Sequence, residues 1–170
     1  MKKTVMTLTL LSSLMYAEMP SNAIEAYNNE NYQEAIVYFI KASNENDIMA
    51  QNRLAIMCSK GLGTKIDKKK ALYWHTIAAK NGHAISQYVL AQSYYNGTTV
   101  YKDIKKSIYW YQRSAAQGYA SAQYKLALLY IQGYEVLKDY KKAKFWMEKS
   151  SNGGSLLAKN AWSKYELWKY

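Results

Sequence analysis

The chain has 170 residues, of which 49% are apolar and 21% charged, and these proportions exclude an intrinsically disordered chain. A single proline and eight glycines leave few helix breakers, which favours an all-α fold. The formal charge of +11 indicates an anionic partner, and the single cysteine, Cys58, excludes an internal disulfide.

The N-terminus has the pattern of a secretory signal peptide. Lys2 and Lys3 precede an apolar run over residues 5–15, which is too short to span a bilayer comfortably, and Ala17 then precedes a polar segment. We expect a signal peptide over residues 1–17; cleavage after Ala23 and an amphipathic first helix remain alternatives. Without Lys2 and Lys3 the chain keeps 21 basic and 12 acidic residues, a charge of +9.

We therefore expect a periplasmic or secreted protein with no transmembrane segment. An exported basic protein meets an anionic glycan, a lipid headgroup or an acidic protein more readily than nucleic acid.

The rest of the chain repeats with a period of 36 residues. Trp74, Trp110 and Trp146 keep this spacing. Six further positions recur in the same register: Gln51, Gln87, Gln123; Ala55, Ala91, Ala127; Gly61, Gly97, Gly133; Asp67, Asp103, Asp139; Lys70, Lys106, Lys142; Gly82, Gly118, Gly154. Such a period is typical of a helical repeat protein.

Each repeat contains the pattern of two helices. An earlier unit places its helices near residues 22–29 and at the segment NYQEAIVYFIKAS. In the best-defined unit, the first helix covers residues 84–96 and ends at Gly97, and the second begins at Asp103 as its N-cap and ends at Gly118. A helical hairpin cannot bury its apolar stripe alone, so the hairpins must stack.

The predicted fold is a right-handed α-solenoid over residues 22–170. The expected boundaries are units at about 22–48, 49–83, 84–119 and 120–154, with a C-terminal capping helix over 155–170. Trp74, Trp110 and Trp146 are expected to fill the core beside the repeated alanines.

Three segments carry a family resemblance: QNRLAIMCSKGLGTKIDKKKALYWHTIAAKNG, QYVLAQSYYNGTTVYKDIKKSIYWYQRSAAQG and QYKLALLYIQGYEVLKDYKKAKFWMEKSSNGG. They resemble the Sel1-like repeat, a branch of the tetratricopeptide superfamily. This resemblance implies an interaction scaffold, often exported in bacteria, that binds proteins. One branch, the cysteine-rich secreted proteins, is described as binding penicillin with weak β-lactamase activity. That branch has paired cysteines, which this chain lacks.

The residues themselves predict no catalytic group, metal site or cofactor. His75 and His83 lie at repeat positions that Tyr111 and Tyr119 occupy in the next unit, so we expect both histidines to be packing residues. Hydrolysis of β-lactams remains the alternative function to a binding scaffold.

Two candidate binding surfaces follow from the repeat. The first lines the concave side, where first-helix positions around the Leu-Ala pair escape the core and suit a peptide or a glycan. Its predicted residues are Asn52, Ile56, Lys60, Tyr88, Gln92, Tyr95, Asn96, Tyr124, Leu128, Ile131 and Gln132. The second is a basic ridge at the start of the second helices, which suits anionic polymers: Lys69, Lys70, Lys105, Lys106, Lys141 and Lys142.

Overall fold

The computed structural model describes residues 20–133 and 135–170, and the predicted signal peptide at residues 1–17 lies outside them. Nine α-helices and one 3-10 turn make up the regular structure of this described part, with no strand. Their bounds are α1 Ser21–Asn28, α2 Tyr32–Asn44, α3 Ile48–Lys60, α4 Lys68–Lys80, α5 Ala84–Asn96, α6 Ile104–Ala116, α7 Ala120–Gln132, α8 Tyr140–Asn152, α9 Leu156–Lys164 and η2 Leu167–Lys169.

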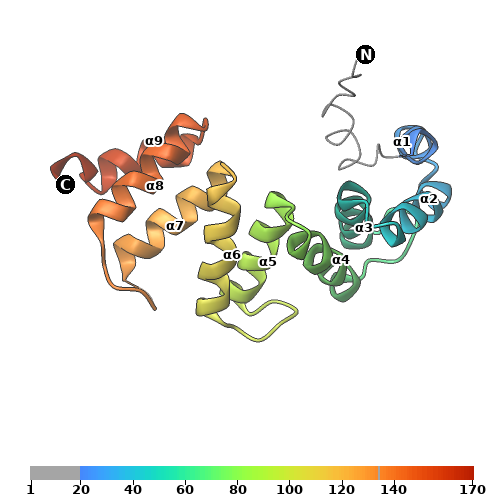
Figure 1. Cartoon of the computed structure of the whole chain (residues 1–170), viewed down its shortest axis with the longest axis horizontal. Coiled ribbons are helices and arrows are strands. Elements are labelled where there is room, and N and C mark those ends of the chain that lie inside the picture. The colour runs from blue at the N-terminus through green and yellow to red at the C-terminus, as the bar shows by residue number, and fades with distance from the viewer. Residues whose placement is uncertain (1–19, 134) are drawn as a thin grey trace, which may run out of the picture.

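Each helix packs against its neighbours in sequence, and the contacts are most extensive within the hairpins α3–α4, α5–α6 and α7–α8. Figure 1 shows the helices following one another in a curved row, with α1 and α9 at opposite ends. This arrangement confirms the predicted all-helical repeat array.

Local sequence signals set the helix ends. The side chain of Asp103 accepts a hydrogen bond from the backbone N–H of Lys106 (2.9 Å) and so acts as the N-cap of α6. Asp67 and Asp139 cap α4 and α8 in the same way. Gly97 ends α5 with a φ of 71°, a left-handed conformation that glycine adopts without steric cost. The predicted bounds of the α5 helix and the Asp103 cap are therefore confirmed.

The core is built from the repeated Leu-Ala pairs of the first helices. Leu54, Leu90 and Leu126 are at most 2% exposed, and the alanines that follow them are fully buried. Side chains of the second helices cover these pairs; Tyr111 and Phe39 are the largest of these that are fully buried, and Met147 is also fully buried.

The tryptophans are not the centre of this core, contrary to the sequence-based expectation. Trp74, Trp110 and Trp146 are only half-buried and pack against the rims of the apolar clusters. The residue that follows each tryptophan is buried instead: His75, Tyr111 and Met147. Tyr109, which precedes Trp110 in α6, is exposed.

Buried glutamines join one hairpin to the next. The side-chain Nε2 of Gln87 donates to the carbonyl of Ala79 (3.1 Å), and Gln51 and Gln123 donate to Ser43 (3.3 Å) and Ala115 (3.1 Å) in the same way. The bonds tie the start of each first helix to the end of the helix before it.

The side-chain oxygens of Gln51 and Gln87 also accept hydrogen bonds. Asn81 Nδ2 donates to Gln51 Oε1 (3.0 Å), and Gln117 Nε2 donates to Gln87 Oε1 (2.8 Å). The corresponding position of the next unit is Gly153, which has no side chain, and Gln123 Oε1 is buried there without a hydrogen-bond partner.

We expect Gln87→Ala to lower the free energy of unfolding by about 2–3 kcal/mol, because two hydrogen bonds are lost, one to the carbonyl of Ala79 and one from the amide of Gln117. Gln123→Ala should cost only about 1 kcal/mol, since it removes one bond and also an unpaired oxygen. Urea unfolding followed by circular dichroism measures both. Equal losses in the two variants would contradict the role of the second bond.

Candidate binding surfaces

The first candidate surface is the first-helix face, formed by α3, α5 and α7. Most of its predicted residues are half-buried or exposed, as a contact surface requires: Ile56, Lys60, Tyr88, Gln92, Tyr95, Asn96, Tyr124, Leu128 and Gln132. No acidic residue occurs on these three helices, whereas Arg53, Lys60 and Lys125 are basic. The face is therefore aromatic, amide-rich and positive.

The placement of two predicted residues on this face is wrong. Asn52 is 6% exposed because it lies in the joint between two units, where its Oδ1 accepts a hydrogen bond from Ser86 Oγ at 3.3 Å. Ile131 is 8% exposed because it packs with Ala143 and Met147 of α8. Neither side chain is available to a partner.

A small pocket of about 130 Å³ opens on the first-helix face, and we call it the α5–α7 pocket. Its lining includes three predicted residues and three others: Tyr95, Leu128 and Gln132, with Tyr111, Lys125 and Leu129. The pocket combines apolar walls with an amide and an ammonium group. Such a combination suits one side chain of a partner and the polar groups next to it.

The sequence reasoning missed Tyr111 and Lys125. Tyr111 lies three residues after Ile108 and four before Ala115, a spacing that places all three on one helical face and could have revealed it. Burial, with Tyr88 and Tyr95 nearby, raises the pKa of Tyr111, so its phenol stays neutral. Lys125 lies at a position that varies in the repeat, where the earlier units have Arg53 and Val89.

Tyr88 extends the aromatic lining toward the start of α7. Its ring lies 5.7 Å from that of Tyr111 and 5.1 Å from that of Tyr119. Burial also raises the pKa of Tyr88. These contacts fix Tyr88 in the wall between units, so this part of the surface is preformed.

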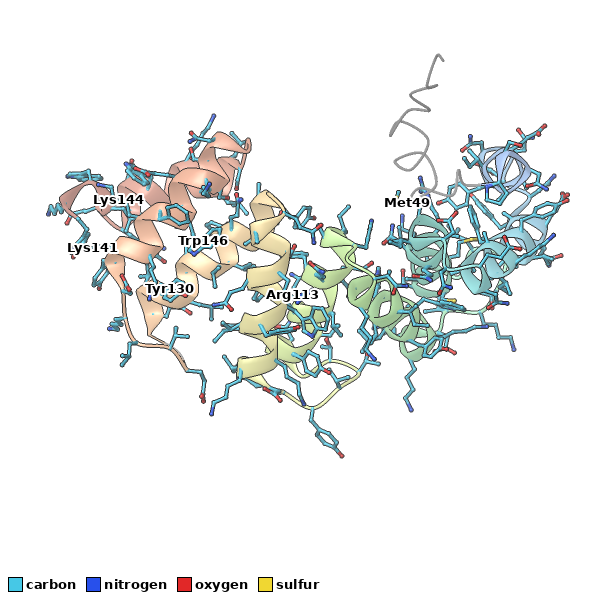
Figure 2. All side chains as sticks on the ribbon, in the orientation of Figure 1. Met49, Arg113, Tyr130, Lys141, Lys144 and Trp146 are labelled. Carbon is cyan, nitrogen blue, oxygen red and sulfur yellow. The ribbon has the colours of Figure 1, made fainter. Side chains whose placement is uncertain are left out.

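The second candidate surface, the basic ridge, divides into two rows. All six predicted lysines are exposed. The inner row consists of Lys70, Lys106 and Lys142. Lys106 forms an ion pair with Asp103 (3.0 Å) and lies 5.5 Å from the centre of the Tyr94 ring. Lys142 forms an ion pair with Asp139 (3.2 Å) and lies 5.5 Å from the centre of the Tyr130 ring, and Figure 2 labels Tyr130.

Lys106 and Lys142 thus serve their own units, whereas Lys70 forms no ion pair within the described residues. Hydrogen bonds from the backbone N–H groups of Lys106 and Lys142 lower the pKa values of Asp103 and Asp139, so both caps stay charged. The outer row consists of Lys69, Lys105 and Lys141. These lysines form no ion pair within the described residues and remain available to a partner.

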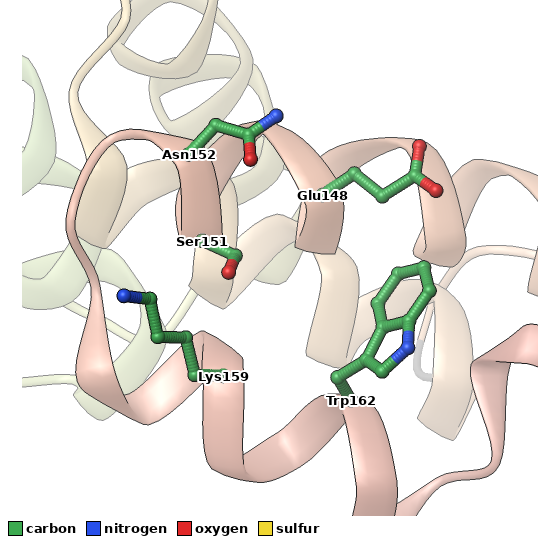
Figure 3. A pocket seen from close by; sticks show the side chains of 5 residues that line it. All are labelled: Glu148, Ser151, Asn152, Lys159 and Trp162. Atoms are coloured by element: carbon green, nitrogen blue, oxygen red, sulfur yellow. The ribbon is translucent and has the colours of Figure 1, made fainter.

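A wider polar pocket of about 270 Å³ lies between α8 and α9. Figure 3 shows Lys159 and Trp162 of α9 facing α8, where Glu148, Ser151 and Asn152 form the opposite side. Lys159 and Trp162 occupy the repeat positions of Gln123 and Leu126, which are buried in α7. The pocket therefore marks the place where the regular repeat ends.

A buried polar joint connects α3, α4 and α5. Ser86 Oγ lies 3.1 Å from His75 Nδ1 and 2.9 Å from His83 Nδ1. The backbone N–H of Ser86 donates to His83 Nδ1 (3.2 Å), which makes His83 the N-cap of α5. A serine beside two histidines has the composition of a nucleophile with a base. Ser86 is nevertheless 0% exposed, so the arrangement is structural.

The joint holds its histidines neutral. Burial, together with the nearby His83, lowers the pKa of His75 from 6.5 to about 4, and burial also lowers the pKa of His83. A proton on His83 Nδ1 would remove the acceptor that caps α5.

Within residues 20–133 and 135–170, no cluster of three or more histidine, cysteine, aspartate or glutamate side chains could hold a metal ion. Cys58 is fully buried, and burial raises the pKa of its thiol. None of the helices in the described ranges is long and apolar enough to cross a bilayer.

Comparison with protein families gives four matches to the Sel1 repeat, at residues 29–47, 48–83, 84–119 and 120–155. They cover most of the chain. The chain belongs to the Sel1 repeat family. The match confirms the resemblance that the 36-residue motifs predicted.

Solved bacterial structures share the fold of this Sel1 repeat protein. A Sel1 repeat protein from Oxalobacter formigenes is 30% identical with a TM-score of 0.74, over 80% of this chain and 56% of that one. The protective antigen c5321 of uropathogenic Escherichia coli is 31% identical with a TM-score of 0.68, over 75% of this chain and 28% of that one.

Among curated proteins, a sel1-like repeat-containing protein of Acanthamoeba polyphaga mimivirus is 38% identical over 74 residues, which are 43% of this chain. The aligned segment is only 14% of the mimivirus protein. The similarity therefore covers the repeats and not the whole of that relative.

We expect acid to destabilise the Sel1 array through His75. As the pH falls from about 6.5 toward 4, the unfolded chain binds a proton that the folded protein excludes, so stability that is present above 6.5 is lost in this window. The loss from this group should reach about 3 kcal/mol.

The variant His75→Met places at this position the side chain that Met147 provides in a later unit. Urea unfolding of both proteins between about pH 7 and pH 4 should show a flatter pH dependence in the variant. If the two proteins lost the same stability, the His75 assignment would be wrong.

Proposed function

We propose that this protein is an exported Sel1 repeat scaffold that binds a peptide segment of a protein partner in the periplasm or outside the cell. The observation that carries the proposal is the α5–α7 pocket, in which Lys125 lies among tyrosine and leucine side chains on a face without acidic residues. Proteins of this family share a repeat array whose regular surface suits an extended ligand.

The lining of the pocket favours a particular kind of peptide. Tyr95 and Leu128 provide an apolar wall for an aliphatic or aromatic side chain. The Gln132 amide both donates and accepts hydrogen bonds, which suits a peptide backbone. Lys125 provides a positive charge, so an acidic residue next to the apolar anchor completes the ligand.

Export is supported by the N-terminal sequence alone, in which Lys2 and Lys3 precede the apolar run over residues 5–15. The expected mature N-terminus is Glu18. Fractionation of expressing cells, followed by N-terminal sequencing, tests this part. Protein recovered from the cytoplasm with Met1 intact would contradict it.

Peptide selection tests the binding. A random peptide library selected on the purified protein should enrich sequences with an apolar residue next to Asp or Glu. Lys125→Glu should weaken the selected peptides by about 10- to 100-fold, because a favourable charge contact becomes a repulsive one.

The matched control is Lys80→Glu, which makes the same charge change at an exposed position at the end of α4. It should leave the affinity within about twofold, since a distant surface charge is screened by salt. Selected peptides that lack acidic residues, or an equal loss in both variants, would exclude the pocket as the binding site.

A further inference from the structure

The second helices carry a column of exposed aromatic rings that the repeat motif does not need for packing. Tyr73, Tyr109 and Phe145 each precede the repeat tryptophan and are 59%, 48% and 48% exposed. They lie 36 residues apart, so the array presents them at equivalent positions. We call these three residues the aromatic column. Large rings at recurrent exposed positions are typical of a contact surface.

The rings of the aromatic column are held in one orientation. Each packs edge-on against the tryptophan that follows it, with centroid distances of 5.2 Å for Tyr73–Trp74, 5.0 Å for Tyr109–Trp110 and 4.9 Å for Phe145–Trp146. The three interplanar angles lie between 73° and 78°. Because the tryptophans are anchored on the core, the rings are preorganised for stacking.

Cations flank the rings on the same helical face. The outer row of the basic ridge, Lys69, Lys105 and Lys141, lies four residues before each ring, one turn along the helix. Arg113 and Lys149 lie four residues after Tyr109 and Phe145, at 5.5 Å and 5.1 Å from the ring centres. Figure 2 shows Arg113 on α6 and Lys141 on α8.

Negative charge near the aromatic column is sparse. Helices α4 and α6 contain no acidic residue and α8 contains one, Glu148. Asp103 and Asp139, the caps of α6 and α8, are paired with the inner-row lysines. Between residues 48 and 133 the chain has 12 lysines and arginines but only two acidic residues, Asp67 and Asp103. A ligand along this surface therefore meets rings and unpaired ammonium groups in alternation.

We propose that the aromatic column and the outer lysine row bind an acidic polysaccharide. The aliphatic C–H face of a sugar ring stacks on an exposed aromatic ring, and the carboxylate groups of the polymer pair with Lys69, Lys105 and Lys141. A polymer with one charge per sugar matches a surface that repeats the same pair of groups in each unit, and several weak contacts add through avidity.

The same surface suits nucleic acid less well. Arginine is the preferred side chain for bidentate contacts to phosphate, and the chain has only Arg53 and Arg113. Arg113 is turned back on its own helix, where it donates to the hydroxyl of Tyr109 at 3.1 Å. The choice of a glycan over nucleic acid also rests on the proposed export of the protein.

Calorimetry with polygalacturonate tests the proposal, and fully methyl-esterified polygalacturonate is the matched neutral probe. We expect binding of the acidic polymer, with affinity at least about tenfold weaker for the ester and falling as salt is added. Undetectable binding of polygalacturonate, or equal binding of the ester, would overturn the proposal.

Two triple variants separate the rings from the charges. The combination Tyr73→Ser, Tyr109→Ser and Phe145→Ser removes the rings, and Lys69→Gln, Lys105→Gln and Lys141→Gln removes the outer row. Each should weaken polygalacturonate binding by about tenfold or more. If the ring variant does not fold by circular dichroism, the single variant Tyr109→Ser replaces it, with an expected loss of about threefold.

The matched control removes the same number of charges elsewhere, through Lys65→Gln, Lys80→Gln and Lys159→Gln. It should retain binding within about twofold if the column is the site. Nonspecific attraction depends on net charge and not on position, so it would weaken equally in the control and in the outer-row variant. A loss as large as that of the outer-row variant would overturn the proposal. So would tighter, column-dependent binding of single-stranded oligothymidylate than of polygalacturonate.

The peptide site and the glycan site are tested independently. Lys125→Glu should weaken the selected peptides by about 10- to 100-fold while polygalacturonate binding persists. The ring variant should weaken polygalacturonate binding while peptide binding persists. The failure of either proposal is therefore visible without the other.

Discussion

The array depends on the buried glutamine that begins each first helix. Gln51, Gln87 and Gln123 each bridge two hairpins by donating to a carbonyl at the end of the preceding helix. Each of these carbonyls also accepts a backbone N–H of its own turn, from Asn46, Gly82 or Gly118, so the glutamine adds a second hydrogen bond that comes from the neighbouring hairpin. One buried side chain per unit thus links two hairpins at the same place in each joint. The regular surfaces of the molecule are consistent with that repeated link.

The joints between successive hairpins are not identical. Between the second and third hairpins, Ser86 and two histidines add a polar cluster that the later joint does not share, since Tyr111 and Tyr119 occupy the histidine positions there. His75 makes the earlier joint sensitive to pH, whereas Tyr111 at the same repeat position forms an aromatic wall beside the α5–α7 pocket. Variation at two repeat positions thus distinguishes a structural joint from a candidate binding surface.

The sequence predicted the fold well because the decisive signals are local. Asp103 and Gly97 bound their helices through contacts within a few residues, and a 36-residue period determines how many hairpins follow. It predicted the site less well because burial between units depends on the angle of stacking. Asn52 and Ile131 satisfy the same spacing rule as Ile56 and Leu128, yet contacts with Ser86 and α8 cover them. The position of Lys125 varies among the units, so periodicity could not identify it.

The two lysines at the start of each second helix illustrate how structural and available charges can be told apart. A cation near a helix N-terminus opposes the helix dipole, and in α6 and α8 the inner lysine offsets this through the capping aspartate and a tyrosine ring. The outer lysine has no such compensation, although it recurs with equal regularity. It lies one turn from a large ring that packs on the neighbouring tryptophan and still remains about half exposed. Because these lysines form no ion pair within the described residues and the rings keep exposed surface, their joint recurrence favours a shared role at the surface.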